Sequence, residues 1–185
     1  MNVLVICGSL RREALTKALG NAVQKLAPKD MAIEIYQIGG FPLYDDVTEE
    51  TAFPEIVKTL RGKIAAADGT IVITPEYNRS MPGSLKNVLD WSSRPDNEPM
   101  PWVGKPVGVL SVSDGVRGGS FANYDVRRIL TYFDAHVMGQ PELHFGEADK
   151  KMSLDGVISD ETSKKRLSKF LNNFKSHVEK LKPAA

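Results

Sequence analysis

The sequence has little cysteine, almost no net charge and no long apolar run, and each absence excludes a class of protein. Cys7 is the single cysteine among 185 residues, which excludes an intramolecular disulfide and predicts a reducing compartment, the cytoplasm. The 24 Lys and Arg residues nearly balance the 23 Asp and Glu residues, and this net charge of +1 argues against a nucleic-acid-binding protein. No stretch approaches the roughly 20 apolar residues that cross a bilayer, so no membrane segment is expected.

Apolar runs alternate with amphipathic stretches along the chain, which predicts alternating strands and helices. Strands are predicted at 3–7, 31–38, 70–74 and 107–112, with a weaker fifth strand within 136–145. Helical stripes are predicted at 15–26, 56–64, 85–89, 126–133 and 167–181. Residues 40–51 are predicted to form a long loop and 95–106 a proline-rich loop.

This alternation predicts one α/β domain over residues 1–185. We expect a flavodoxin-like, doubly wound, five-stranded parallel sheet between two helical layers, a three-layer sandwich with strand order 2-1-3-4-5. In such sheets ligands bind beyond the carboxyl ends of the strands, where the strand order reverses. The loops after strands 3–7, 70–74 and 107–112 are therefore the expected site.

The first of these loops has the chemistry of a phosphate site. It contains one glycine, Gly8, so it is neither a dinucleotide-binding motif nor a P-loop. It offers the hydroxyls of Ser9 and Thr16, the guanidinium of Arg11 and the N–H groups of a helix N-terminus, which together suit a single phosphate. The alternative is that Ser9 is an ordinary helix N-cap beside exposed arginines.

The other two loops suit a flat ring. Two prolines stiffen residues 75–83, which carry the carboxylate of Glu76, the ring of Tyr77 and the amide of Asn78, although a plain turn is the alternative. The three glycines in 113–120 allow backbone to come close to a ligand. One phosphate site and two ring-binding loops predict a mononucleotide cofactor, and FMN fits that outline.

Several motifs along nearly the whole chain point to one family. They are Gly8-Ser9-Leu10-Arg11, Pro75-Glu76-Tyr77-Asn78, Leu85-Lys86-Asn87, Asp90-Trp91, Gly104-Lys105-Pro106 and Gly118-Gly119. Together they resemble the NADPH-dependent FMN reductase family, and more narrowly its quinone and chromate reductase branch. The resemblance implies bound FMN, NADPH or NADH as co-substrate, and a homodimer or homotetramer. It also implies reduction of quinones, free flavins, azo compounds or chromate.

The resemblance also implies which residues bind the cofactor. By position these are Ser9, Leu10, Arg11, Leu15, Thr16, Pro75, Glu76, Tyr77, Asn78, Val112, Ser113 and Gly115. We expect hydride to pass from NAD(P)H to the flavin and then to the acceptor, so that no side chain serves as a catalytic nucleophile. Tyr44, Arg79 and Arg117 are substrate-contact candidates, a half-buried loop aromatic and solvated arginines being the alternatives. The three histidines lack metal-ligand spacing, and no metal is predicted.

Two positions depart from the family pattern. The family commonly has Ser at the place of Ala14 and Asn at the place of Thr16, so one hydroxyl is missing and an amide has become a hydroxyl. A hydrogen bond to a charged group is worth about 1.5–3 kcal/mol. We therefore expect weaker FMN binding than the family pattern provides.

Three rival functions share this fold class. A response-regulator receiver is excluded because it needs acidic residues at the end of the first strand to bind Mg²⁺, where this chain has Cys7-Gly8-Ser9. A low-molecular-weight phosphatase is excluded because Glu13 stands six residues after Cys7, where that chemistry needs an arginine, so Cys7 is interpreted as a buried strand residue. The alternative that remains is a flavodoxin-type electron carrier, which would bind FMN and pass electrons to protein partners. Such carriers are usually strongly acidic, whereas this chain has a net charge of +1.

Overall fold

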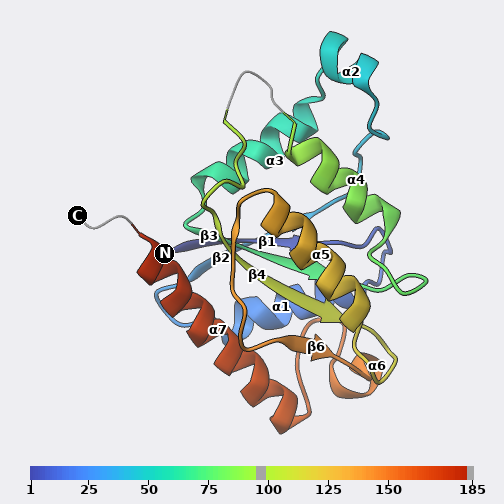
Figure 1. Cartoon of the computed structure of the whole chain (residues 1–185). Coiled ribbons are helices and arrows are strands. Elements are labelled where there is room, and N and C mark those ends of the chain that lie inside the picture. The colour runs from blue at the N-terminus through green and yellow to red at the C-terminus, as the bar shows by residue number, and fades with distance from the viewer. Residues whose placement is uncertain (95–98, 183–185) are drawn as a thin grey trace.

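The computed structural model describes residues 1–94 and 99–182, in which strands and helices alternate (Figure 1). The strands are β1 (Asn2–Cys7), β2 (Ala32–Gln37), β3 (Gly69–Thr74), β4 (Pro106–Val112), β5 (His136–Val137) and β6 (Leu143–Phe145). The helices are α1 (Leu15–Leu26), α2 (Asp46–Thr51), α3 (Glu55–Ala66), α4 (Gly83–Ser92), α5 (Ser120–Tyr132), α6 (Ala148–Lys151) and α7 (Glu161–Leu181). Residues 95–98 of the predicted proline-rich loop and residues 183–185 lie outside the described residues.

The strands form one parallel sheet in the order β2-β1-β3-β4-β5, which confirms the predicted order. β1 lies between β2 and β3, so that Val5 stands opposite Ile35 on one side and Ile71 on the other. The central strands β3 and β4 are buried along their whole length, whereas β2 at the sheet edge is only partly covered. The order reverses between β1 and β3, as the prediction of the site requires.

The fifth position of the sheet differs from the prediction. Instead of one strand within 136–145, β5 pairs with the beginning of β4 and β6 pairs with its end. Gly139 and Pro141 lie between the two strands. A proline has no N–H for the ladder and a glycine weakens a strand, so a continuous fifth strand does not form.

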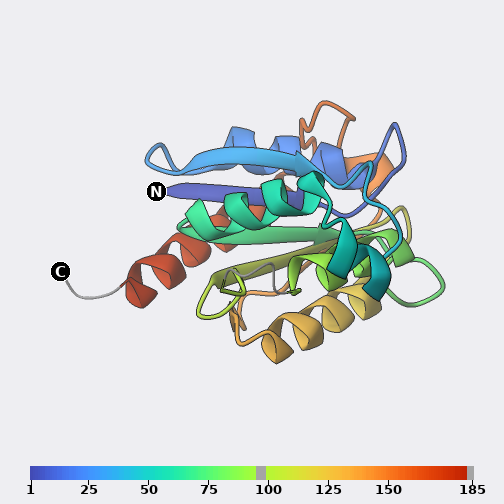
Figure 2. The same cartoon turned by 90° about the horizontal axis from the view of Figure 1, so that it is seen from above.

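Two helical layers cover the sheet, which confirms the three-layer sandwich (Figure 2). Alternate residues of β1 point to opposite faces: Val3 and Val5 pack with α1 and α7, and Leu4 and Ile6 pack with α3, α4 and α5. Within the described residues, no helix combines the length and apolar character needed to cross a membrane.

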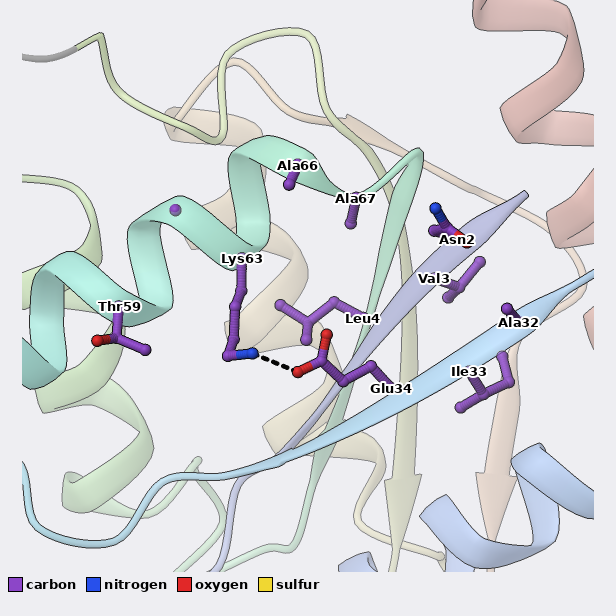
Figure 3. A pocket seen from close by; sticks show the side chains of 11 residues that line it. Asn2, Val3, Leu4, Ala32, Ile33, Glu34, Thr59, Lys63, Ala66 and Ala67 are labelled. Atoms are coloured by element: carbon purple, nitrogen blue, oxygen red, sulfur yellow. Dashed lines mark hydrogen bonds and ion pairs between the residues drawn. The ribbon is translucent and has the colours of Figure 1, made fainter.

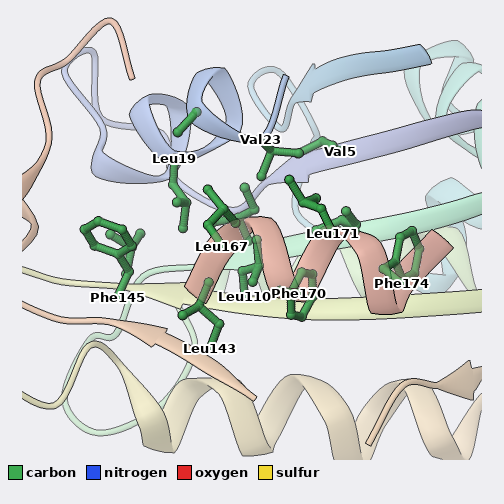
Figure 4. Close-up of a cluster of buried hydrophobic side chains, with 14 of the residues drawn as sticks. Val5, Leu19, Val23, Leu110, Leu143, Phe145, Leu167, Phe170, Leu171 and Phe174 are labelled. Carbon is green, nitrogen blue, oxygen red and sulfur yellow. The ribbon is translucent and has the colours of Figure 1, made fainter. Parts of the chain in front are cut away.

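Helix α7 lies close to the sheet because two strand residues have no side chain. A Cβ atom at Gly108 would stand 2.9 Å from Cζ of Phe170, and one at Gly69 would stand 2.8 Å from Cγ2 of Val178. The rings of Phe170 and Phe174 therefore pack directly on the strand backbone, as part of the cluster in Figure 4. This packing fixes α7 in the helical layer to which α1 also belongs.

The predicted loop 40–51 contains a short helix, α2. Asp45 is its N-cap, with a carboxylate that accepts hydrogen bonds from the Thr48 N–H at 2.8 Å and the Thr48 hydroxyl at 2.5 Å. Asp46 and Glu49 add negative charge to the first turn, which favours a helix N-terminus. The capping residue and the acidic first turn are visible in the sequence. A loop was predicted because the stretch lacks the apolar periodicity of an amphipathic helix.

Replacing Phe170 with alanine should destabilise the fold without touching the carboxyl edge of the sheet. The side chain is fully buried, and deleting a buried phenylalanine ring typically lowers the free energy of unfolding by about 3–5 kcal/mol. Urea denaturation measures this. Lys169→Ala, at the exposed neighbouring position, is the control and should change the same quantity by less than about 0.5 kcal/mol. Equal effects of the two substitutions would contradict the assigned packing.

Candidate functional site

The loops after β1, β3 and β4 meet at the carboxyl edge of the sheet and line a cavity of about 80 Å³. Its lining consists of Ser9, Arg11, Ala14, Leu15, Thr16, Pro75, Glu76, Tyr77, Val112, Ser113 and Asp114. Liquid water occupies about 30 Å³ per molecule, so the enclosed part accommodates one small polar group. The remainder of a larger ligand would lie along the three loops.

Gly8 joins the first two loops. Its N–H donates a hydrogen bond to the carbonyl oxygen of Ile73 at 2.8 Å, which pairs β1 with β3 one residue beyond Cys7. A Cβ atom at this position would stand 2.9 Å from the same oxygen and 2.7 Å from Cδ2 of Leu85. Only glycine fits without displacing its neighbours, and the β1 loop therefore begins beside the end of β3.

Helix α1 points an uncapped N-terminus at the cavity. The helix begins at Leu15, and its N-cap residue Ala14 supplies no side-chain hydrogen bond. The alternative of Ser9 as N-cap is wrong, because its hydroxyl accepts the N–H of Arg11 at 3.2 Å, several residues before the helix. The first N–H groups of a helix have no acceptor within the helix and carry partial positive charge. This end of α1 is suited to an anion.

Besides the uncapped N-terminus of α1, Thr16 indicates that the cavity is suited to an anionic ligand. Its side chain is fully buried, and within the described chain its hydroxyl has no hydrogen-bond partner. Leaving a buried polar group unpaired costs about 1–3 kcal/mol. Thr16 lines the cavity together with Arg11 and with Ala14 and Leu15 at the N-terminus of α1. These residues fit a phosphate group.

The β3 loop is a tight hairpin. The N–H of Tyr77 donates to the carbonyl oxygen of Ser80 at 2.9 Å, and the N–H of Ser80 donates back to Tyr77 at 3.0 Å. Asn78 and Arg79 form the tip, with φ angles of 50° and 63°. Positive φ at both central residues is the geometry of a type I′ turn. Glu76 and Tyr77 thus line the cavity while the tip extends beyond it.

All the predicted cofactor residues line the cavity except Leu10, Asn78 and Gly115. Leu10 lines a neighbouring hollow of about 250 Å³ instead. Gly115 contributes its carbonyl oxygen to the loop itself, accepting from the Ser113 hydroxyl at 3.1 Å. The structure adds Asp114, which the sequence reasoning missed although it stands between two predicted residues.

None of the three substrate-contact candidates lines this cavity. The hydroxyl of Tyr44 donates to Glu49 at 2.7 Å, which raises the pKa of the tyrosine, and its ring packs against Trp91 with centroids 5.0 Å apart. The guanidinium of Arg79 lies 5.2 Å from the ring centroid of Phe121. Arg117 is exposed on the β4 loop.

One glycine of the β4 loop serves packing rather than a ligand. Gly118 has a φ angle of +59°, and a Cβ atom there would stand 2.6 Å from the carbonyl carbon of His144 and 2.8 Å from the nitrogen of Gly146. The expectation that it lets the backbone approach a ligand is therefore corrected. Its positive φ and its contact with the end of β6 explain why a glycine stands at this position.

Cys7 is fully buried at the end of β1, and burial raises the pKa of its thiol to about 12. Its Sγ donates to the carbonyl oxygen of Thr16 at 3.4 Å. A thiol in this state is not a nucleophile, as the sequence interpretation held. Across residues 1–94 and 99–182, no three His, Cys, Asp or Glu side chains gather as metal ligands.

A larger hollow lies between β2 and α3, with a volume of about 550 Å³ (Figure 3). Glu34 and Lys63 form an ion pair within it, so these charges are already paired. Asn2 and Ala32, at the beginnings of their strands, line it as well, which places it away from the carboxyl edge of the sheet. The cavity below the three loops remains the candidate site.

Known proteins match this chain over nearly its whole length. Residues 1–150 match the family model of the NADPH-dependent FMN reductases. A quinone reductase of Pseudomonas putida is 41% identical over 177 residues, 96% of this chain and 94% of the relative. A 2-hydroxy-1,4-benzoquinone reductase of a Burkholderia species is 38% identical over 178 residues, 96% of both chains.

The solved structures include a similar molecule. FerB, a flavoenzyme NAD(P)H:(acceptor) oxidoreductase from Paracoccus denitrificans, superposes with a TM-score of 0.88 at 36% sequence identity, covering 97% of each chain. The match in sequence, the sheet order and the phosphate-suited cavity agree with one another. The chain belongs to the NADPH-dependent FMN reductase family.

Proposed function

We propose that this protein is an FMN-dependent NAD(P)H oxidoreductase whose acceptors are quinones. The observation that carries the proposal is the buried hydroxyl of Thr16, which has no partner among the described residues and belongs to the first turn of the uncapped helix α1. The printed names of the P. putida and Burkholderia relatives support quinones as the acceptor class. The net charge of +1 weighs against an electron carrier, which would usually be acidic.

The phosphate of FMN would bind at the end of the cavity formed by the β1 loop. The hydroxyl of Thr16 and the first N–H groups of α1 would donate hydrogen bonds, and Arg11 would supply positive charge. Ser9 is buried, and its hydroxyl already accepts from the Arg11 N–H, which holds the loop in this shape. Ala14 contributes only a methyl group.

The flat ring would lie between the β3 and β4 loops. Pro75, Glu76 and Tyr77 line one side of the cavity, and Val112 and Ser113 line another. Backbone N–H groups of the β3 loop other than those of Tyr77 and Ser80, which bond to each other, would face the ring edge and stabilise negative charge there. When bound, FMN supplies the transfer of two electrons from NAD(P)H to the acceptor.

The chain has to supply little further chemistry. Reduction of a quinone to a hydroquinone takes up two protons besides two electrons. Tyr77 and Asp114 are exposed at the cavity, so water can deliver protons there. Cys7, with its raised pKa, takes no part. The proposed location is the cytoplasm, where NAD(P)H is available.

The central test is spectroscopic. The purified protein, supplied with FMN, should carry a yellow chromophore that NADPH or NADH bleaches anaerobically and that 1,4-benzoquinone restores. The reason is that one bound flavin exchanges electrons with both reactants in turn. A protein that takes up no FMN would refute the proposal, and bleaching too slow to sustain turnover would favour the electron carrier.

Thr16→Val should weaken FMN binding without destabilising the FMN-free protein. Valine keeps the shape but removes a hydroxyl proposed to bond a charged phosphate, a change worth about ten- to a hundredfold in affinity. Titration of flavin fluorescence gives the dissociation constant. Thr70→Val is the matched control, because Thr70 is also buried with an unpartnered hydroxyl in the described chain but does not line the cavity. Equal affinities in the Thr16 variant and the parent would remove Thr16 from the phosphate site.

We also propose that the protein is a homodimer or homotetramer. Large apolar side chains are exposed near the site on the β1, β3 and β4 loops and on α5: Leu10, Tyr77, Val116, Phe121 and Tyr124. Such side chains gathered at one edge favour a protein interface. Light scattering on the eluted peak should give a molar mass at least twice the 20.4 kDa of one chain. A mass of one chain at micromolar concentration would contradict this.

A further inference from the structure

We propose that Glu76 is a positioning residue: its carboxylate holds the β3 loop against the N-terminus of α5 and so keeps the loop in the shape that binds FMN. The inference rests on the proposed function and changes the role expected for Glu76 from the sequence. Its side chain acts through a helix, rather than only by contact with the cofactor.

The carboxylate accepts two backbone hydrogen bonds. Oε2 of Glu76 accepts from the N–H of Phe121 at 2.9 Å and from the N–H of Ala122 at 3.2 Å. Both belong to the first turn of α5, whose N-cap residue Gly119 has no side chain to cap it. This turn also contains no acidic residue of its own. Glu76 therefore supplies both the cap and the negative charge that a helix N-terminus favours.

Two other contacts join the same loop to the same helix. The hydroxyl of Ser80 donates to Oδ2 of Asp125 at 2.6 Å, and the guanidinium of Arg79 lies over the ring of Phe121. These contacts involve the tip and far side of the hairpin. Glu76 differs from them because it lies at the start of the hairpin and also lines the cavity.

Because Glu76 joins the β3 loop to α5, the affinity for FMN should depend on how well this loop is ordered. A loop released from α5 would populate its binding shape only part of the time, and apparent affinity falls by that fraction. The amide hydrogens of Tyr77 and Ser80 would then exchange with solvent faster, because the hydrogen bonds between these two residues form only in the closed hairpin. Loss of Glu76 should thus be visible both in the FMN-free protein and in cofactor binding.

The experiment compares Glu76→Ala and Glu76→Gln with Asp160→Ala. Asp160 is a matched control, because its carboxylate caps α7 by accepting from the Ser163 N–H at 2.7 Å and does not line the cavity. Three quantities are measured: the melting temperature of the FMN-free protein, hydrogen exchange of the Tyr77 and Ser80 amides, and the FMN dissociation constant.

Both alanine variants should lower the melting temperature, since each loses a helix cap. Only Glu76→Ala should speed exchange at Tyr77 and Ser80, and it should weaken FMN binding by about tenfold. Glu76→Gln should stay within about fivefold of the parent affinity, because the amide oxygen still accepts both N–H groups and only the charge is lost.

The outcomes separate this inference from the proposed function. Unchanged FMN affinity in a folded Glu76→Ala protein would make Glu76 a helix cap only and overturn the inference. Equal losses in the Gln and Ala variants would also overturn it, because hydrogen bonding would then not explain the effect. If the parent binds no FMN, the proposed function fails, and the exchange data alone decide whether Glu76 orders the loop.

Discussion

The hydrogen bond from Gly8 to Ile73 is the contact on which the site depends. It pairs the end of β1 with β3, and the absence of a side chain at Gly8 allows this approach. The chain turns away immediately afterwards, which brings Ser9 to the same cavity as Pro75. Helix α1 then packs back on the sheet with its N-terminus at that cavity. A bulkier residue at position 8 would push the β1 loop away from the end of β3.

The cavity is identified as the candidate site because several groups suited to an anion meet there, and no single group would be sufficient. Thr16 and Thr70 both have buried hydroxyls without a partner in the described chain. Thr70 lies inside β3, away from the cavity, and its unpaired hydroxyl is a local cost to stability. Of these two threonines in the described chain, Thr16 alone lies beside an uncapped helix and an arginine, an arrangement that fits an anion.

The charge of Glu76 is compatible with an anionic cofactor because α5 compensates it. A free carboxylate on the cavity wall would repel phosphate. Here the carboxylate accepts two N–H groups at the positive end of a helix. The same contact that orders the β3 loop therefore also reduces its electrostatic conflict with the ligand.

Local patterns were enough to predict the architecture. The apolar runs of β1, β3 and β4 and the stripe of α7 depend on residues close in sequence, and the strand order follows from their alternation with helices. The three loops that line the candidate cavity were predicted from the fold class, because a doubly wound sheet brings the ends of β1 and β3 together. Helix α2 and the division of the fifth strand were missed, since a cap residue and a single proline are weaker signals than periodicity.

The sequence by itself determined the fold class, the loops that line the candidate cavity and the family. Tertiary structure alone decided what individual side chains do within those loops. Glu76 caps a helix 45 residues further along the chain, and Gly118 is required by the backbone at the end of β6. Contacts between residues so distant in sequence arise only when the sheet brings the loops together, so no local pattern encodes them.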